Sequence, residues 1–352
     1  MQIGWIQLLE FRNYRTLEFN PSPRLNLLIG PNAQGKTNLL EALGFLLTGR
    51  SFRTSRIMEI PRWGASSASI AGEVRRTEEG SRTIRRAIRR LENGNVQTAG
   101  DACEWARVIA FGWQDLEVVN GPPGARRNFI DGFAGRLYPG HIATLVRYRQ
   151  IMARRNLLLQ SREPGVEALL EPWDEQLATA GAELIARRRK AAAMLQTELG
   201  RVFPALSGEQ RKVEIRYSTA LGGSAETGDI LAALEKARRE ELRRGVTVVG
   251  PHRDDLTIEL DGVDVRAYGS RGQQRLIALA LRLAEVLPVT EAVGTAPVLL
   301  LDDALSELDA RVRENALREI HGAEQVFLTS PDALPAVGAV SYRVKGGEVA
   351  RA

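Results

Sequence analysis

Cysteine and long apolar runs are nearly absent from this chain of 352 residues. The single cysteine, Cys103, excludes an intramolecular disulfide framework and suits a reducing cytosol. No segment approaches the run of about 18 apolar residues that a membrane span needs. Charged residues follow closely behind the short apolar N-terminus, so a signal peptide is not expected. These absences predict a soluble, cytoplasmic protein with no membrane partner.

Lysine is scarce as well, because only five of the 48 basic residues are lysine and the others are arginine. The formal net charge is +5 at pH 7. This mild positive balance permits a polyanionic partner without requiring one. The composition is that of an ordinary globular protein, and the length allows two or three domains of about 100–200 residues each.

The most informative segment is residues 30–37, where Gly30 and Gly35 are separated by four residues and followed by Lys36 and Thr37. An apolar run at 25–29 predicts a buried strand before it, and 38–47 predicts a helix after it. Glycines let backbone N–H groups converge on an anion, while Lys36 reaches the terminal phosphates and the Thr37 hydroxyl can ligate Mg²⁺. The segment is therefore interpreted as a phosphate-binding loop for a nucleoside triphosphate, with Asn32 and Asn38 as further binding candidates.

The rest of the chain predicts an α/β fold with a helical insert. Strands are expected at 3–11, 16–19, 108–111, 246–249 and 326–329, antiparallel strands at 67–75 and 83–90, and a hairpin at 256–260 and 263–268. Helical periodicity covers more than a hundred residues from Arg126, and prolines at 164, 172 and 204 argue against a long coiled coil. The expected domains are 1–120, the first part of a head; 121–245, an inserted α-helical lobe; and 246–352, the second part of the head.

A second nucleotide-associated motif is the acid pair Asp302 and Asp303, which follows four apolar residues that predict a buried strand. Carboxylates at the C-terminal end of such a strand lie where ligands bind in α/β sheets. Asp302 would hold a metal-bound water beside Thr37, and Asp303 would orient or deprotonate the attacking water. The two motifs together predict hydrolysis of a nucleoside triphosphate.

The turn at 269–274 opens a helix that is expected over about 276–286. Its Ser270, Arg271, Gly272 and Gln273 offer backbone N–H groups, a hydroxyl and a helix dipole to an anion. Because the chain already has one such cradle at 30–37, the second cradle suggests a nucleotide shared between two copies. This predicts an ATP-dependent homodimer.

Taken together, these motifs resemble the RecF family of recombination mediators within the ABC/SMC-type ATPases. The matching segments are 11–15, 30–42, 49–53, 126–131, 250–255, 269–275 and 299–309. The resemblance implies an ABC-type P-loop ATPase head, a mixed sheet with an antiparallel part, and a compact helical second lobe. It also implies ATP-dependent dimerisation on DNA at gaps and single-/double-strand junctions, weak DNA-dependent ATPase activity, action with RecO and RecR to load RecA, and association with the nucleoid.

The resemblance also assigns roles. Lys36 and Thr37 bind phosphate and metal, Asp302 is the Mg²⁺ acid and Asp303 the catalytic acid. Ser270 and Gly272 form the signature that acts in trans, Asp309 belongs to a dimer-contacting loop, and Gln114 links the metal to the second lobe. The sequence departs from the family twice: Thr329 and Ser330 stand where many ABC ATPases have a switch histidine, and the segment before Gln114 lacks the usual proline.

Other classes share parts of this pattern. A transporter subunit would have the same head but needs a membrane partner, and a chromosome-maintenance ATPase of the SMC type is a further alternative. A phosphate-loop kinase would need an acceptor site, and a nuclease-linked ATPase a second acidic metal cluster. Two arginine-rich runs could be solvated faces or DNA contacts: Arg85, Arg86, Arg89 and Arg90; and Arg187, Arg188, Arg189 and Lys190.

Overall fold

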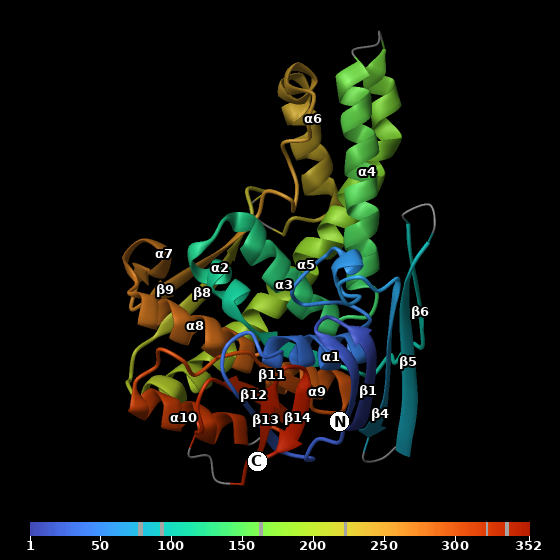
Figure 1. Cartoon of the computed structure of the whole chain (residues 1–352). Helices are drawn as coiled ribbons and strands as arrows, with labels where there is room; N and C mark the ends of the chain where they lie inside the picture. The colour runs from blue at the N-terminus through green and yellow to red at the C-terminus, as the bar shows by residue number, and fades with distance from the viewer. Residues whose placement is uncertain (77–79, 92–94, 162–164, 222–223, 322, 335–337) are drawn as a thin grey trace. The chain divides into compact units, whose positions relative to one another are not determined.

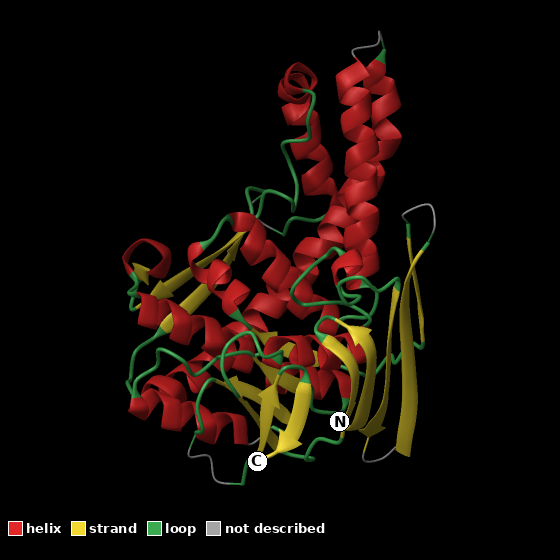
Figure 2. Cartoon of the chain, viewed as in Figure 1, coloured by secondary structure: helices red, strands yellow, loops and turns green. Residues whose placement is uncertain are grey.

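The computed structural model describes residues 1–76, 80–91, 95–161, 165–221, 224–321, 323–334 and 338–352, which form two compact units (Figure 1). The first unit comprises Met1–Leu116, Arg201–Gln210 and Arg271–Ala352. The second comprises Glu117–Gly200 and Arg211–Ser270. The expected α/β fold with an inserted helical part is confirmed (Figure 2).

A six-stranded sheet organises the first unit. Its strand order is β14 (Glu348–Arg351), β13 (Val340–Lys345), β3 (Leu25–Ile29), β12 (Val326–Ser330), β11 (Val298–Leu301) and β7 (Val108–Phe111), and all neighbours except β14 and β13 are parallel. The continuous apolar runs of β11 and β12 are buried at every position, as expected of strands covered on both faces. The C-terminal ends of β3, β12 and β11 therefore share one edge, where α/β sheets bind ligands.

A second sheet in the same unit is antiparallel. Its order is β2 (Tyr14–Phe19), β1 (Gln2–Phe11), β4 (Ser67–Arg76), β5 (Gly80–Arg90) and β6 (Val96–Gly100). Alternating burial along β4 shows that one face packs inward and the other is open. Helix α1 (Lys36–Thr48) shares one hydrophobic core with the inward face and with β3, β11 and β12. The sequence did not predict β6, whose short and mostly polar run carries little strand signal.

The remaining helices of the first unit flank these sheets. They are the 3-10 turns η1 (Ile57–Glu59) and η2 (Trp113–Asp115), the end of α5 (Val166–Ser207), α8 (Arg271–Leu283), α9 (Val286–Val293) and α10 (Ala310–His321). Helix α8 begins and ends earlier than expected, because its first turn carries the polar residues of the 269–274 motif rather than apolar ones.

The second unit contains the helices α2 (Leu116–Asn120), α3 (Pro123–Leu137), α4 (His141–Ser161), most of α5, α6 (Thr227–Arg244) and α7 (Val265–Tyr268). Its core joins apolar residues of α4, α5 and α6, including Leu145, Leu184 and Leu234. Helix α5 runs through Pro172 and Pro204 without ending, whereas residue 164 lies outside the described residues. None of the described helices is long and apolar enough to cross a membrane.

The expected strand at 246–249 is wrong. Side chains satisfy the backbone of this segment: Thr247 N donates to Asn156 Oδ1 at 2.8 Å, and Val248 N donates to Glu241 Oε1 at 2.8 Å. Strand β9 (Asp255–Leu260) has an additional partner, β8 (Val213–Ser218), which the sequence did not predict because it lies within the helical stretch. Through this pairing residues 246–270 belong to the second unit, rather than to the head as the range 246–352 had assumed.

The second arm of the expected hairpin is also shorter than predicted. Strand β10 contains only Val263–Asp264, and the chain then turns into the one-turn helix α7. The Asp264 carboxylate accepts hydrogen bonds from the N–H groups of Arg266 and Ala267. This N-cap satisfies the free donors of a helix start and so ends the strand.

In the run Arg187, Arg188, Arg189 and Lys190, the three arginines make contacts within the second unit. The buried Arg188 guanidinium donates to both Asp131 oxygens at 2.7 Å. Arg187 pairs with Glu183 at 2.5 Å, and Arg189 donates to the Ser224 carbonyl at 2.6 Å. This run stabilises the unit and does not offer a row of free charges.

Candidate nucleotide-binding site

The phosphate loop leads from β3 into α1. Gly35 has φ +115°, and a Cβ there would lie 2.5 Å from Asn13 Nδ2, so only glycine fits this position. The hydroxyl of Tyr14 donates to the Gly35 carbonyl at 3.0 Å, and Asn13 Nδ2 donates to the Gln34 carbonyl at 3.3 Å. The turn between β1 and β2 therefore braces the loop at the start of the helix.

Lys36 is the first residue of α1 and is buried. Its Nζ donates to the carbonyl of Gly30 at 2.6 Å and to that of Pro31 at 2.9 Å. Burial lowers the pKa of this ammonium, while the charges of Asp303 and Asp302 oppose the change. The ammonium group is thus held inside the loop, as expected for a side chain that is predicted to contact phosphate.

Thr37 and Asp302 meet although they lie far apart in the chain. The Thr37 hydroxyl lies 2.9 and 2.8 Å from the two Asp302 carboxylate oxygens. Burial raises the pKa of Asp302, and its hydrogen bonds with Thr37 and Thr329 oppose that change. A partly buried carboxylate beside a hydroxyl is a donor set that suits Mg²⁺, whose charge would favour the ionised carboxylate.

Thr329, at the end of β12, connects the two acids. Its hydroxyl donates to Asp302 Oδ1 at 2.9 Å and accepts from Asp303 N at 2.8 Å. Asp303 has φ +51°, a left-handed conformation that costs a non-glycine residue about 1 kcal/mol. The Arg275 guanidinium, from α8, donates to the Asp303 carbonyl and to Ser306 Oγ and so helps to hold this conformation.

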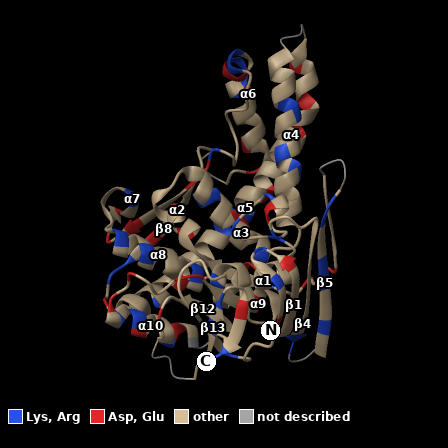
Figure 3. Ribbon diagram, viewed as in Figure 1, with Lys and Arg blue, Asp and Glu red and all other residues tan. Residues whose placement is uncertain are grey.

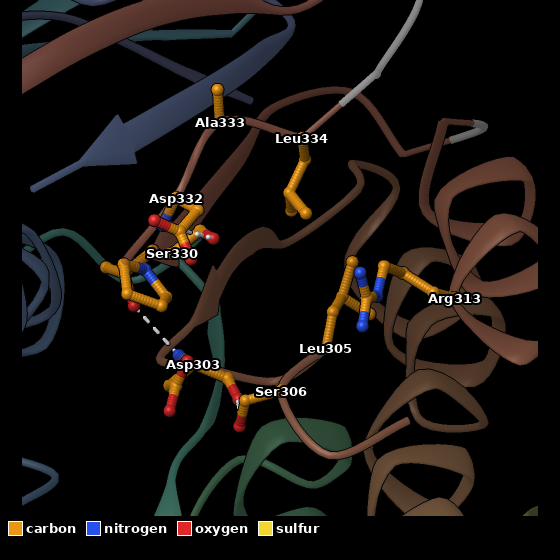
Figure 4. A pocket seen from close by; sticks show the side chains of 10 residues that line it. Asp303, Leu305, Ser306, Arg313, Ser330, Asp332, Ala333 and Leu334 are labelled. Carbon is orange, nitrogen blue, oxygen red and sulfur yellow. Dashed lines mark hydrogen bonds between the residues drawn. The ribbon is translucent and has the colours of Figure 1, made fainter. Parts of the chain in front are cut away.

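A pocket of about 140 Å³ opens beside Asp303 (Figure 4). Hydroxyl groups of Ser306, Thr329 and Ser330 line it, together with the side chains of Arg313 and Asp332. Leu305, Pro331, Ala333 and Leu334 complete the lining, and the volume with its polar groups is sufficient for several ordered waters. Asp303, which is exposed, therefore has water-accessible space next to its carboxylate.

Gln114 lies in η2, directly after β7, the strand that neighbours β11. Its Nε2 donates to the Arg53 carbonyl at 3.0 Å. The same turn is fixed by Asp115, whose carboxylate accepts from Gly112 N at 2.7 Å and from Arg282 at 2.8 and 2.6 Å. A Cβ on Gly112 would lie 4.0 Å from Asp302 Cβ, so this turn passes close to Asp302.

Sequence reasoning assigned no role to the ion-pair cluster around Glu41. This fully buried carboxylate accepts from Arg12 at 2.8 and 2.7 Å, from Arg53 at 3.3 Å and from Ser51 Oγ at 2.6 Å. Arg53 also donates to Asn38 Oδ1 at 2.6 Å, and its charge acts on Asp302. The sequence signals for it were the segments 11–15, 30–42 and 49–53, which contain Arg12, Glu41 and Arg53 but had no role assigned to these side chains. Asn32 is exposed on the loop.

The other predicted site residues lie at the starts of α8 and α10. Ser270 is the last residue of the second unit, and Arg271 begins α8 in the first. Ser270, Arg271 and Gly272 are exposed, and Gln273 is half-buried. Asp309 caps α10, because its Oδ1 accepts from Val312 N at 2.9 Å.

These features together define the nucleotide-binding head of an ABC-type ATPase. They are the phosphate loop after β3, the acid pair after β11, the hydroxyl that bridges the two acids, and the antiparallel sheet that shares the hydrophobic core of α1. Comparison with known proteins agrees. The family model of the RecF/RecN/SMC N-terminal domain matches residues 2–334. The chain belongs to the RecF family of DNA replication and repair proteins.

The similarity to RecF proteins spans the whole chain. The chain is 38% identical to a DNA replication and repair protein RecF of Chloroflexus aurantiacus, with 99% of each chain covered. It is 35% identical to that of Heliobacterium modesticaldum, covering 100% of this chain and 99% of the relative. A solved structure of the recombination mediator RecF with ATP superposes with a TM-score of 0.89 at 30% identity, covering 100% and 97% of the two chains. An Smc head, at 15% identity and a TM-score of 0.59, shares the fold.

Proposed function

We propose that this chain is an ATP-dependent DNA-binding protein of recombinational repair, in which ATP and Mg²⁺ drive dimerisation on DNA and slow hydrolysis resets the monomers. The observation that carries the proposal is the junction of the phosphate loop with the acid pair, where the Thr37 hydroxyl lies 2.9 and 2.8 Å from the Asp302 carboxylate oxygens. The full-length similarity to RecF proteins supports the repair role and a cytoplasmic place beside the DNA.

The chemistry is assigned to residues of the chain. Lys36 and the backbone N–H groups of the loop bind the phosphates, and Thr37 with Asp302 would hold Mg²⁺, which when bound neutralises phosphate charge. Asp303 would accept the proton of the attacking water, and Gln114 in η2 would contribute to holding the metal. Thr329, at the position where many ABC ATPases have a switch histidine, keeps both acids in place.

A homodimer would complete each site. Ser270, Arg271, Gly272 and Gln273 lie at or next to the start of α8, where exposed backbone and hydroxyl donors can approach the γ-phosphate held by a partner. Asp309 lies in the loop that would face the partner. ATP then stabilises the dimer, because it binds both faces together.

In the cell we propose action at single-strand gaps and at single-/double-strand junctions, with RecO and RecR as partners and the loading of RecA as the outcome. A solved relative is described as the recombination mediator RecF with ATP in the RecFOR pathway, which supports this placement.

Two variants test the shared nucleotide. Ser270→Arg places a bulky side chain on the trans face but leaves the phosphate loop intact, so monomers should bind ATP yet neither dimerise nor hydrolyse it. Lys36→Ala should lose ATP binding but keep its own signature turn. Mixing the two proteins completes one of the two composite sites, so nucleotide-dependent mixed dimers should form on a sizing column and partial ATPase activity should return.

The control is each variant alone at the same total concentration. If Ser270→Arg by itself dimerises with ATP and hydrolyses it like the wild type, the trans mechanism is wrong. DNA binding is then measured separately, on gapped, duplex and single-stranded DNA with and without ATP.

A further inference from the structure

The arginines of β5 divide between two faces of the antiparallel sheet. Arg85 and Arg89 are exposed, whereas Arg86 is half-buried and points to the side that packs on α1. Because side chains alternate along a strand, the run that looks continuous in sequence is two sets with different environments. Figure 3 shows several basic positions along β5.

On the open face, the neighbours of Arg85 and Arg89 on β4 have short side chains, whereas the neighbour of Arg89 on β6 is Gln97. Opposite them on β4 stand Ala71 and Ser67, and Ala87 between them pairs with Ser69 on β4 and Ala99 on β6. Neither β5 nor β6 contains an aromatic residue that could stack on an unpaired base. On the β4 side the two guanidinium groups are therefore flanked by short side chains, which leaves them accessible to a wide partner.

Arg85 and Arg89 give this face positive charge, which the nearby carboxylate of Asp101 offsets only in part. In the part of the chain that the structure describes, the side chains of Arg85 and Arg89 have no ion-pair partner. The acids nearby are engaged: Glu73 pairs with Arg75 at 2.7 Å, and Asp101 Oδ2 accepts from the backbone N–H of Arg85 at 2.8 Å. At about 3.3 Å per residue, Arg85 and Arg89 lie about 13 Å apart along the strand. This is close to the roughly 12 Å width of the major groove, so both can reach phosphates on its two sides.

Arg86 ties the same strand to the phosphate-loop helix. Its Nε donates to the Leu46 carbonyl at 2.7 Å and its Nη2 to the Leu47 carbonyl at 3.2 Å, which satisfies acceptors in the last turn of α1. The next residue after the helix, Gly49, has φ +67°, and a Cβ there would lie 2.6 Å from Arg86 Nη1. The missing side chain thus makes room for the guanidinium at the opposite end of the helix that carries Lys36 and Thr37.

We propose that the open face of β5 is a contact for the phosphates of a DNA duplex, and that Arg86 transmits this contact to α1 and so to the nucleotide site. The inference rests on the proposed function and adds to it the surface that meets DNA. Contacts of this kind are sequence-independent and weaken steeply with salt.

The first test compares two double variants that remove the same charge from exposed strand positions of the first unit. Arg85→Ser with Arg89→Ser should weaken binding of a duplex about tenfold and lower the slope of log affinity against log salt by about 1.8, because each duplex phosphate contact contributes about 0.9. Arg343→Ser with Arg351→Ser, on β13 and β14, is the control and should bind like the wild type.

The outcomes separate the two proposals. If the wild type binds the duplex but the β5 variant keeps its affinity, or if both double variants lose it equally, the β5 surface is wrong while the proposed function stands. If the wild type binds no DNA in any nucleotide state, the proposed function fails, and the inference fails with it. Thermal unfolding of both variants checks that the fold is kept.

The second test concerns the link through Arg86. Arg86→Gln should bind duplex DNA within about twofold of the wild type, since Arg85 and Arg89 remain, but lose most of the stimulation of ATPase activity by DNA. Arg86→Lys keeps the charge and one carbonyl contact and should restore part of it. A purely structural role would lower ATPase activity with and without DNA in the same proportion, and that result, or full stimulation in Arg86→Gln, overturns the link.

Discussion

Lowering the pH from 7 to 5 should destabilise the second unit through one half-buried histidine, His252. His252 Nε2 lies 3.1 Å from the Thr247 carbonyl, and its Nδ1 lies 2.8 Å from the Tyr148 hydroxyl. Because a carbonyl can only accept, Nε2 carries the proton, and Nδ1 accepts from the tyrosine. The neutral ring is therefore fully hydrogen-bonded, and a second proton has no acceptor unless Tyr148 turns its hydroxyl.

Burial lowers the pKa of His252 from 6.5 to about 4, with the charges of Arg253, Arg127 and Arg188 acting in the same direction. The unfolded chain thus binds more protons than the folded one between these two values. Stability from the neutral ring is complete above about pH 6.5 and is lost as the pH falls toward 4. This pKa shift corresponds to a loss of about 3 kcal/mol in the free energy of unfolding once the pH is well below 4. About 2 kcal/mol of that is lost between pH 7 and pH 5.

The assay is amide hydrogen exchange of peptides from α4 and α6, which report opening of the second unit alone. His252→Gln is the matched control, because an amide can donate to Thr247 and accept from Tyr148 without titrating. The free energy of opening should fall by about 2 kcal/mol more in the wild type than in the variant when the pH drops from 7 to 5. Equal losses in the two proteins would refute the assignment of this pH dependence to His252.

Three further predictions concern the first unit. Lys36→Ala should abolish ATP binding, because no other loop side chain can place a cation beside the β and γ phosphates; an ATP affinity within twofold of the wild type, measured by calorimetry, would contradict this. Asp303→Asn should still bind Mg·ATP and accumulate as an ATP dimer while turnover falls by about 10²- to 10⁴-fold, since an amide cannot accept the water's proton; wild-type turnover would remove its assigned role. Glu41→Gln should lower the free energy of opening of α1 by about 3 kcal/mol, because it leaves Arg12 and Arg53 without their buried partner. The exposed control Glu59→Gln should change this free energy by less than about 1 kcal/mol. Hydrogen exchange of α1 peptides measures both, and equal effects would show that the buried ion pairs of Glu41 do not stabilise α1 more than an exposed pair does.

The parts of the fold that sequence predicted well are those that local patterns specify. The runs at 25–29 and 298–301 are apolar at nearly every position, which is possible only for strands covered on both faces, and both are buried strands. The phosphate loop follows from glycine spacing, because a close approach of backbone to anion leaves no other choice of residue. Periodicity of 3.6 residues likewise predicted the helices of the second unit.

Predictions failed where side chains from distant segments compete with local propensity. The β-branched segment 246–249 is not a strand, because Asn156 and Glu241 take up its backbone N–H groups. Prolines 172 and 204 served only to argue against a long coiled coil; both lie inside α5, where packing of its apolar face stabilises the helix by more than a missing hydrogen bond costs.

The sequence by itself determined the residue types of the site: a phosphate loop, two acids at a strand end and a glycine-rich turn at a helix start. Only the tertiary structure decided how they act together. It placed the Thr37 hydroxyl on Asp302, made Thr329 the link between the two acids, and separated Arg86 from Arg85 and Arg89 on opposite faces of one sheet. These relations depend on pairing between strands that are hundreds of residues apart in the chain, and on which face of a sheet is covered. A local sequence pattern contains no information on the pairing or on the covered face.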